Sequence, residues 1–347
     1  REAELLEPGA LERSNRPDPP LREAIDRYIA ESERELGRTK AQVLRTIKGH
    51  AIADLPCSTI TSAEILAFAQ QLKCKPQTRN NYLSHLSAIF AIARPAWGYQ
   101  LDHQAMLDAM KVGKRLGTLG RSDRRDRRPT LEELDRLLLH FEERQMRRPS
   151  MNPMTKLIVF AIFSTRRMEE ITRIRWEDLQ PGRVMVRDMK DPGEKIGNDV
   201  WVDLVPEAEA IIHSMPRVAD EIFPYGCDAI SAAFTRACKF LGITDLHFHD
   251  LRHEGVSRLF EMGWNIPHVA AVSGHRSWNS LKRYTHIRQT GDKYDGWPWL
   301  DRATKAQHVR SKAVRGEAWY QLHAGLVDPD LPGRGRKPAR PQPAKAR

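Results

Sequence analysis

The residues His249-Asp250-Leu251-Arg252-His253 open a segment whose apolar residues recur at helical spacing as far as Met262. Within it, His249 and Arg252 are three positions apart, so a helix places both on one face. The planar fork of an arginine matches two oxygens of a phosphate and keeps its charge. The segment therefore predicts a helix that carries a phosphate-binding face.

Three motifs around this segment add groups of the same kind. The sequence S-T-R-R-M-E-E-I at 164–171 lies where one helix ends and another begins, with Arg167 and Glu170 on a shared face. The sequence S-G-H-R-S at 273–277 puts His275 beside a glycine turn, and Tyr284 follows nine residues after that histidine. Together they supply a nucleophile and a cluster of cations, which an attack on a phosphate requires.

Other phosphate chemistries are disfavoured by what the sequence lacks. It has no G-x-x-x-x-G-K-[ST] loop and no close set of acids for two metals. His247, His249 and His253 invite a zinc site, but no further ligands stand at suitable spacing. We therefore expect no metal and no cofactor.

Composition points to a polyanionic partner. The 347 residues suffice for two domains, and the formal net charge is +11. The 4 cysteines are widely separated, which argues against an extracellular disulfide framework. No secretory signal and no run of about 18 apolar residues is present, so we expect a cytoplasmic, nucleoid-associated protein without a membrane span.

Six consecutive segments are expected along the chain. Residues 1–20 read as a flexible arm, 21–114 as a small all-helical domain, and 115–129 as a basic linker that follows a phosphate backbone. A second domain spans 130–290, with a hairpin predicted from strands at 184–187 and 200–204. An extension over 291–330 and a basic, disordered tail over 331–347 complete the chain.

Nucleic-acid contacts are predicted from two places. The helix expected over 78–93 has a polar face whose side chains reach phosphates or base edges, and the linker is rich in arginine. The predicted contacts are Arg79, Asn80, Asn81, His85, Arg121, Arg124, Arg125, Arg127 and Arg128.

The order of these motifs resembles the tyrosine recombinase (phage integrase) family. An arginine, a hairpin lysine, H-x-x-R, G-H and a tyrosine nine residues later recur over 130–287, and residues 21–114 are similar in general layout. The resemblance implies a mostly α protein: a helical, SAM-like core-binding domain and an α+β catalytic domain with a small antiparallel sheet, arranged as a two-domain clamp.

The resemblance also implies roles for single residues. Tyr284 attacks the phosphate, and the cations around it help to generate its phenolate. The lysine that protonates the leaving oxygen is Lys190 or, because hairpin lengths vary, Lys195. Thr165 and Arg166 depart from the commoner T-G-L-R, which makes Arg166 a rival of Arg167 for the first arginine. The implied catalytic set is Arg167, Lys190, His249, Arg252, His275 and Tyr284, supported by Glu170.

Within the family, the motifs around Arg252, His275 and Tyr284 look most like those of shufflon-specific recombinases, which invert DNA segments. Integration or excision of a mobile element, a catalytically silent DNA-binding relative and a type IB topoisomerase remain as alternatives. The family implies double-stranded DNA as the partner, with two protomers at each site and four in the synapse. The sequence Gly296-Trp297-Pro298-Trp299 leaves open whether the extension docks on its own subunit or on a neighbour.

Overall fold

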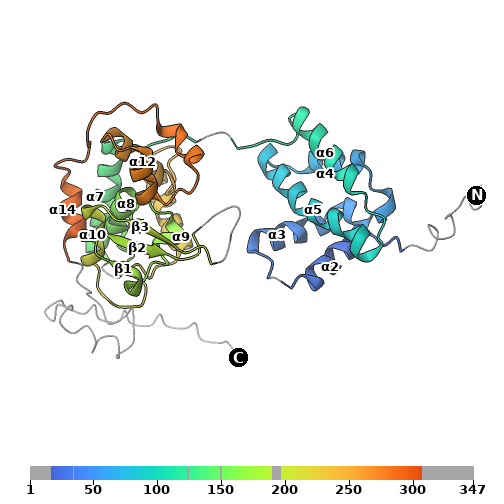
Figure 1. The fold of residues 1–347 in the computed structure, drawn as a ribbon, viewed down its shortest axis with the longest axis horizontal. Coiled ribbons are helices and arrows are strands. Elements are labelled where there is room, and N and C mark those ends of the chain that lie inside the picture. Colours follow the sequence, from blue (N-terminus) through green and yellow to red (C-terminus); the bar gives the residue numbers. More distant parts are fainter. Residues whose placement is uncertain (1–16, 34, 123–124, 149–150, 190–196, 307–347) are drawn as a thin grey trace, which may run out of the picture. The chain divides into compact units, whose positions relative to one another are not determined.

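The computed structural model describes residues 17–33, 35–122, 125–148, 151–189 and 197–306. The chain divides into two compact units, Arg1–Arg125 and Asp126–Arg347, each with a hydrophobic core of its own. Figure 1 shows a first unit made of helices and a second in which helices surround a small sheet. The mostly α class with an α+β second unit is confirmed.

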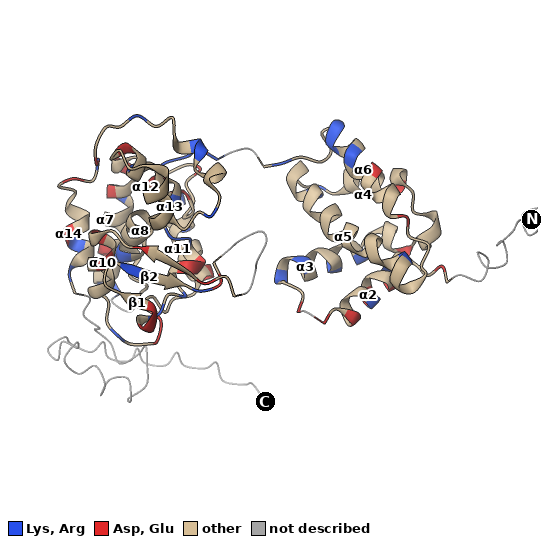
Figure 2. Cartoon of the chain, viewed as in Figure 1, with Lys and Arg blue, Asp and Glu red and all other residues tan. Residues whose placement is uncertain are grey.

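Within its described residues, the first unit contains the α-helices α2 (Leu21–Glu31), α3 (Arg38–Lys48), α4 (Ser62–Gln71), α5 (Pro76–Trp97) and α6 (His103–Arg115). Thr61 and Glu64 form the capping box that begins α4, and Gly98 ends α5 in a left-handed conformation (φ 71°). The helix that the sequence predicts over 78–93 corresponds to α5. Figure 2 shows basic residues gathered at the C-terminal end of α6.

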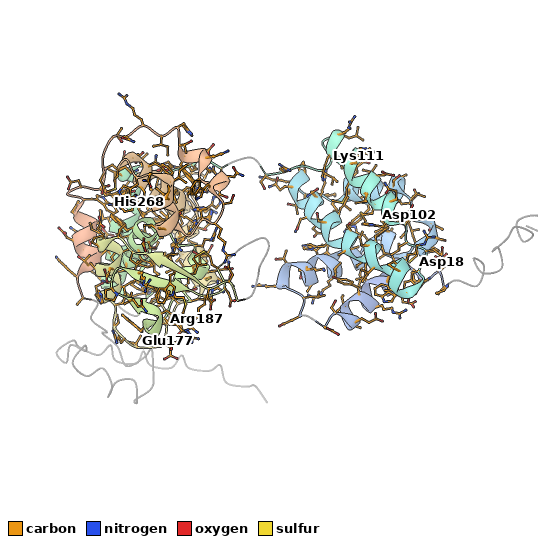
Figure 3. All side chains as sticks on the ribbon, in the orientation of Figure 1. Asp18, Asp102, Lys111, Glu177, Arg187 and His268 are labelled. Atoms are coloured by element: carbon orange, nitrogen blue, oxygen red, sulfur yellow. The ribbon has the colours of Figure 1, made fainter. Side chains whose placement is uncertain are left out.

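Both edges of the first unit differ from the predicted boundaries. Asp18, marked in Figure 3, accepts hydrogen bonds from the backbone and hydroxyl of Ser58, so the end of the expected flexible arm packs on the unit. Leu119 is buried in the same core, although it was assigned to the linker. The structure differs from the predicted linker at this point because the burial of one apolar side chain, close to the end of α6, is enough to fix a basic segment to the first unit.

The second unit contains the helices α7 (Leu131–Arg147), α8 (Met154–Ser164), α9 (Met168–Ile171), α10 (Pro206–His213), α11 (Cys227–Phe240), α12 (Asp250–Glu261), α13 (Ile266–Ser273) and α14 (Pro298–Thr304). Helix α8 is buried along its whole length. Its sequence, M-T-K-L-I-V-F-A-I-F-S, is apolar on every side, as a central helix requires.

The sheet has three antiparallel strands in the order β1 (Leu179–Gln180), β2 (Arg183–Val186) and β3 (Val200–Asp203). Val184 pairs with Val202 and faces the core with it. Beyond the strands, Met189 and Asn198 exchange two more hydrogen bonds of 2.8 and 2.6 Å. Arg187 forms an ion pair with Glu177, and Figure 3 marks both residues beside the sheet. The predicted hairpin is thus present, and β1 is an additional strand.

The segment after Tyr284 folds onto its own subunit in the part of the chain that the structure describes. Tyr294, Trp297 and Trp299 lie in the core of the second unit, and α14 packs on α8 and α10 (Figure 1). The buried Lys156 of α8 donates to the carbonyl oxygens of Ala303 and Lys305 at 2.7 and 2.5 Å. Residues 292–304 therefore belong to the core rather than to a separate extension.

Replacing Trp297 by phenylalanine should lower the free energy of unfolding by about 1 kcal/mol, because the indole Nε1 donates to Asp135 Oδ1 at 2.8 Å. Denaturant unfolding of the pure protein measures the change. Since the contact lies within one subunit, the loss should be the same at all protein concentrations. A loss that grows on dilution would contradict docking in cis.

No helix within the described part of the chain combines the length and the apolar character needed to span a bilayer.

Candidate active site

The first predicted arginine stands at the junction of α8 and α9. Thr165 ends α8 in a left-handed conformation (φ 57°), which turns the chain so that Arg167 becomes the N-cap of α9. The carboxylate of Glu170 accepts two hydrogen bonds from this N-cap residue, one from the backbone N–H of Arg167 at 3.1 Å and one from its Nη1 at 2.5 Å. The side chain of Arg167 stays 27 % exposed, which leaves part of its guanidinium free to meet a ligand.

Arg166, the rival for the first position, lies beneath the site. Its side chain is fully buried, and it donates to the carbonyl oxygens of Ser164 and Val272. The geometry favours Arg167 as the arginine that meets a ligand, and it gives Arg166 a supporting position that the sequence did not predict.

Glu170 joins three arginines. It is 1 % exposed, and its carboxylate lies 2.5 Å from Arg167, 3.7 Å from Arg166 and 3.9 Å from Arg252. Burial alone would raise the pKa of Glu170, but the three guanidinium groups lower it well below its usual range. A permanent negative charge therefore holds the arginines together before any phosphate arrives.

Arg252 projects from the first turn of α12 and is 4 % exposed. Nη1 donates to the carbonyl oxygen of Thr165 at 2.5 Å, and Nη2 donates to that of Ser273 at 3.0 Å. Burial, together with the charges of Arg166 and Arg167, lowers the pKa of Arg252 to about 9, so the group remains charged at neutral pH. The backbone carbonyls at the ends of α8 and α13 thus fix the orientation of the Arg252 guanidinium group.

His275 follows the glycine turn at the end of α13, where Gly274 has a φ of 68°. Its Nε2 lies 3.2 Å from Arg252 Nη2, and its Nδ1 lies 2.7 Å from Ser273 Oγ. An arginine only donates, so Nε2 is the acceptor and Nδ1 carries the proton. Burial and the neighbouring arginines lower the pKa of His275 to about 3, which makes the ring neutral near pH 7.

These groups border an open groove of about 820 Å³ in the second unit. Arg167, His249 and His275 line it, together with Met189 and Asn198 from the ends of the hairpin. Three of the predicted site residues, from separate parts of the sequence, therefore meet at one cavity. Arg252 lies directly behind His275.

The predicted hairpin lysines, Lys190 and Lys195, lie outside the described residues. Their neighbours Met189 and Asn198 lie on the groove, and Arg276 donates to Asn198 Oδ1. The assignment of the lysine remains a prediction.

Tyr284 ends the short 3₁₀ turn Lys282–Tyr284 and is 7 % exposed. Its ring stacks on Phe260 at 5.9 Å, and its hydroxyl lies 2.6 Å from Nδ1 of His253. Burial raises the pKa of Tyr284, although Arg283 and Arg252 act in the opposite direction. The cations therefore act on this pKa in the expected direction, but in the resting state the desolvation of the hydroxyl outweighs them.

The proximity of His253 to the proposed nucleophile is not predicted from the sequence, which suggests this histidine only as a zinc ligand. Its ring meets that of His249 edge-on at 5.1 Å. The spacing of four between His249 and His253 already predicts a shared helix face. The sequence holds no signal that Tyr284 lies against this face.

The predicted DNA contacts fall into different environments. Asn81 and His85 lie half-buried on α5, and Arg79 uses Nε to donate to the carbonyl oxygen of Leu72 at 3.0 Å. The side-chain oxygen of Asn80 is buried without a hydrogen-bond partner. These positions neither support nor oppose a DNA contact.

The arginines of the predicted linker divide into two groups. Arg121 is exposed and Arg125 half-buried in the first unit, whereas Arg124 lies outside the described residues. Arg127 pairs with Glu133, and Arg128 pairs with the buried Glu254 and with Glu261. In this structure both side chains form ion pairs within the second unit, and their contact with DNA stays a prediction.

Comparison with known proteins agrees with this arrangement. Residues 128–290 match the Phage integrase family. A shufflon-specific DNA recombinase of Escherichia coli is 31 % identical over 325 residues, which cover 89 % of this chain and 78 % of the relative.

Solved structures share the fold at low sequence identity. A lambda integrase tetramer bound to a Holliday junction has a TM-score of 0.60 at 20 % identity, covering 80 % of this chain and 84 % of its own. The Tn1549 transposon integrase in complex with transposon right end DNA has a TM-score of 0.57 at 14 % identity, covering 76 % and 94 %.

Proposed function

This chain belongs to the phage integrase family of tyrosine recombinases, and we propose that its reaction runs through a covalent bond between Tyr284 and the 3′ phosphate of a DNA strand. The membership makes it a site-specific DNA recombinase. The observation that carries the proposed chemistry is the cluster of three arginines around Glu170. Of these, Arg167 lines the groove, and Arg252 contacts His275, which also lines it.

The roles follow from position and charge. Arg167 and Arg252 bind the non-bridging oxygens of the scissile phosphate and stabilise the charge that develops on them. His275 and His249, which also line the groove, complete this cradle. A lysine of the hairpin, Lys190 or Lys195, protonates the departing 5′ oxygen. Because the phosphodiester energy stays in the phosphotyrosine bond, a second 5′ hydroxyl reverses the step without ATP.

A silent DNA-binding relative is the less favoured reading. Its cavity has no need of a nucleophile or of a buried charge cluster. Here Arg167, Arg252, His249, His275 and Tyr284 are all present within the described residues, and Glu170 holds the arginines in place.

DNA inversion is the proposed outcome of the reaction. Its support is the 31 % identity to a shufflon-specific recombinase over most of both chains. Integration or excision of a mobile element uses the same chemistry and is the alternative, since the orientation of the two sites decides the product.

Double-stranded DNA and further copies of the chain are the proposed partners. The net charge of +11 favours a polyanion, and one structural relative is a tetramer on a Holliday junction. Two protomers on each site and four in the synapse are proposed by analogy with that assembly.

Sequencing the DNA that becomes covalently trapped tests this proposal. The protein is incubated with fragments of its source genome, denatured with detergent, and the adducts are recovered and sequenced. We expect a short recurring site attached to the peptide that contains Tyr284. A plasmid with two inverted copies should then invert the intervening DNA, whereas direct copies should delete it. Absence of any adduct on sites that the protein binds would exclude the proposed chemistry.

A further inference from the structure

The hydroxyl of Tyr284 has one close partner among the contacts that the structure records, and this is His253. The distance between Oη and Nδ1 is 2.6 Å, a short hydrogen bond. His253 lies on α12 immediately after Arg252, so the same turn of helix positions both the Arg252 guanidinium group and the His253 ring. The tyrosine ring also stacks on Phe260.

The proton on this hydroxyl is a chemical problem for the proposed reaction. A neutral phenol is a weak nucleophile, and its ordinary pKa is about 10. Burial raises the pKa of Tyr284 further. The phenolate is therefore scarce in the resting site, and attack at neutral pH needs a group that removes the proton as the oxygen advances.

We propose that His253 is this group: its Nδ1 accepts the hydroxyl proton of Tyr284 during attack on the scissile phosphate. The bond from Tyr284 Oη to phosphorus forms while the bond from phosphorus to the 5′ oxygen breaks, and the 5′ oxygen takes its proton from the hairpin lysine. In rejoining, the imidazolium of His253 returns its proton to the departing phenolate. This role rests on the phosphotyrosine chemistry proposed above.

The surroundings of His253 keep it able to accept a proton. Burial, then the charges of His249 and Arg283, lower the pKa of His253 to about 4. Because the shift is downward, the neutral base is fully available above that pH and is lost only in acid. The charged and titratable groups that face the pair are His249 at the N-cap of α12, Asp250 and Arg252 on α12, Arg283 beside the tyrosine, and Asp126 and Arg128 before α7.

His249 is less well placed for the same task. It is exposed and lines the groove, and the centroid of its ring lies 5.1 Å from that of His253. The structure records the hydroxyl of Tyr284 on His253 instead. The exposed ring of His249 lines the groove, which suits the phosphate contact proposed for it above.

The first test is the pH dependence of the wild-type enzyme, measured as single-turnover cleavage of a suicide substrate. With an internal base of low pKa, the rate should be flat between about pH 6 and pH 9. A rate that rises tenfold per pH unit over this range would show that hydroxide removes the proton, and it would overturn the proposal without any variant.

The second test uses His253→Asn, whose side chain still pairs with the hydroxyl but cannot take its proton. We expect cleavage at pH 7 to fall on the order of 100-fold and to rise with pH, with DNA binding and thermal melting unchanged. The control is His268→Asn on the exposed face of α13 (Figure 3), which should cleave like the wild type. Equal rates and flat profiles for His253→Asn and wild type would refute the base.

A substrate with sulfur in place of the bridging 5′ oxygen separates this base from the acid. Sulfur leaves without a proton, so it should rescue variants of the hairpin lysine but not His253→Asn. Rescue of His253→Asn would make His253 the acid instead. If wild-type protein forms no adduct on either substrate, the proposed function fails; if only the histidine effects are missing, this inference alone fails.

Discussion

Tyr284→Phe is expected to abolish the covalent protein–DNA adduct completely while DNA binding remains. The variant lacks the only atom that can attack phosphorus in the proposed reaction, and no neighbour can replace it. Its ring can keep the stacking contact with Phe260, so the fold should lose no more than about 1 kcal/mol from the missing bond to His253.

The measurement is detergent-resistant adduct on a suicide substrate, with gel-shift binding in parallel. Tyr99→Phe is the matched control: this tyrosine is also buried and hydrogen-bonded, but it lies in the first unit. It should form normal amounts of adduct. Adduct formation by Tyr284→Phe at even a few per cent of the wild-type level would remove Tyr284 from the mechanism.

Gly255→Ala should unfold the second unit or leave it severely destabilised. At Gly255, helix α12 crosses α8 so closely that an added Cβ would lie 1.9 Å from the carbonyl oxygen of Ile162. That oxygen belongs to a buried helix and cannot rotate away, so the two helices must separate. Such overpacking costs roughly 3 kcal/mol or more.

The effect on activity should exceed the effect on stability. Arg252 and His253 precede Gly255 on the same helix, and Arg252 donates to the end of α8 at Thr165. A shift of α12 should therefore disrupt the proposed phosphate cradle even where the unit still folds. The control is Gly226→Ala, at a position with an ordinary negative φ and open space around its Cβ. A Gly255→Ala protein that melts and cleaves like this control would disprove the close crossing.

The residues proposed to bind the phosphate could be found in the sequence because their signals are local. The spacing of three in Arg167 and Glu170, and in His249 and Arg252, corresponds to one helix face. The glycine before His275 marks a turn that needs a positive φ, which the structure has at Gly274. The hairpin was predicted from its turn residues and short apolar strands for the same reason.

Segment boundaries were harder to predict than the helices themselves. Leu119 and Arg128 both lie in a stretch whose composition is typical of a solvated linker. One is buried in the first unit, and the other pairs with the buried Glu254 of the second. Composition averages over many residues, whereas the boundary of a folded unit depends on the tertiary contacts of single side chains.

The sequence by itself determined the class of the fold, the family, and the charged and nucleophilic groups, because short helical spacings and turn chemistry encode them. Only the tertiary structure decided three other features. Arg167, rather than the buried Arg166, reaches the groove. Trp297 docks on its own subunit. His253 receives the hydroxyl of Tyr284 across 31 residues of sequence. Each depends on contacts between segments that are far apart in the sequence, and no local pattern records such contacts.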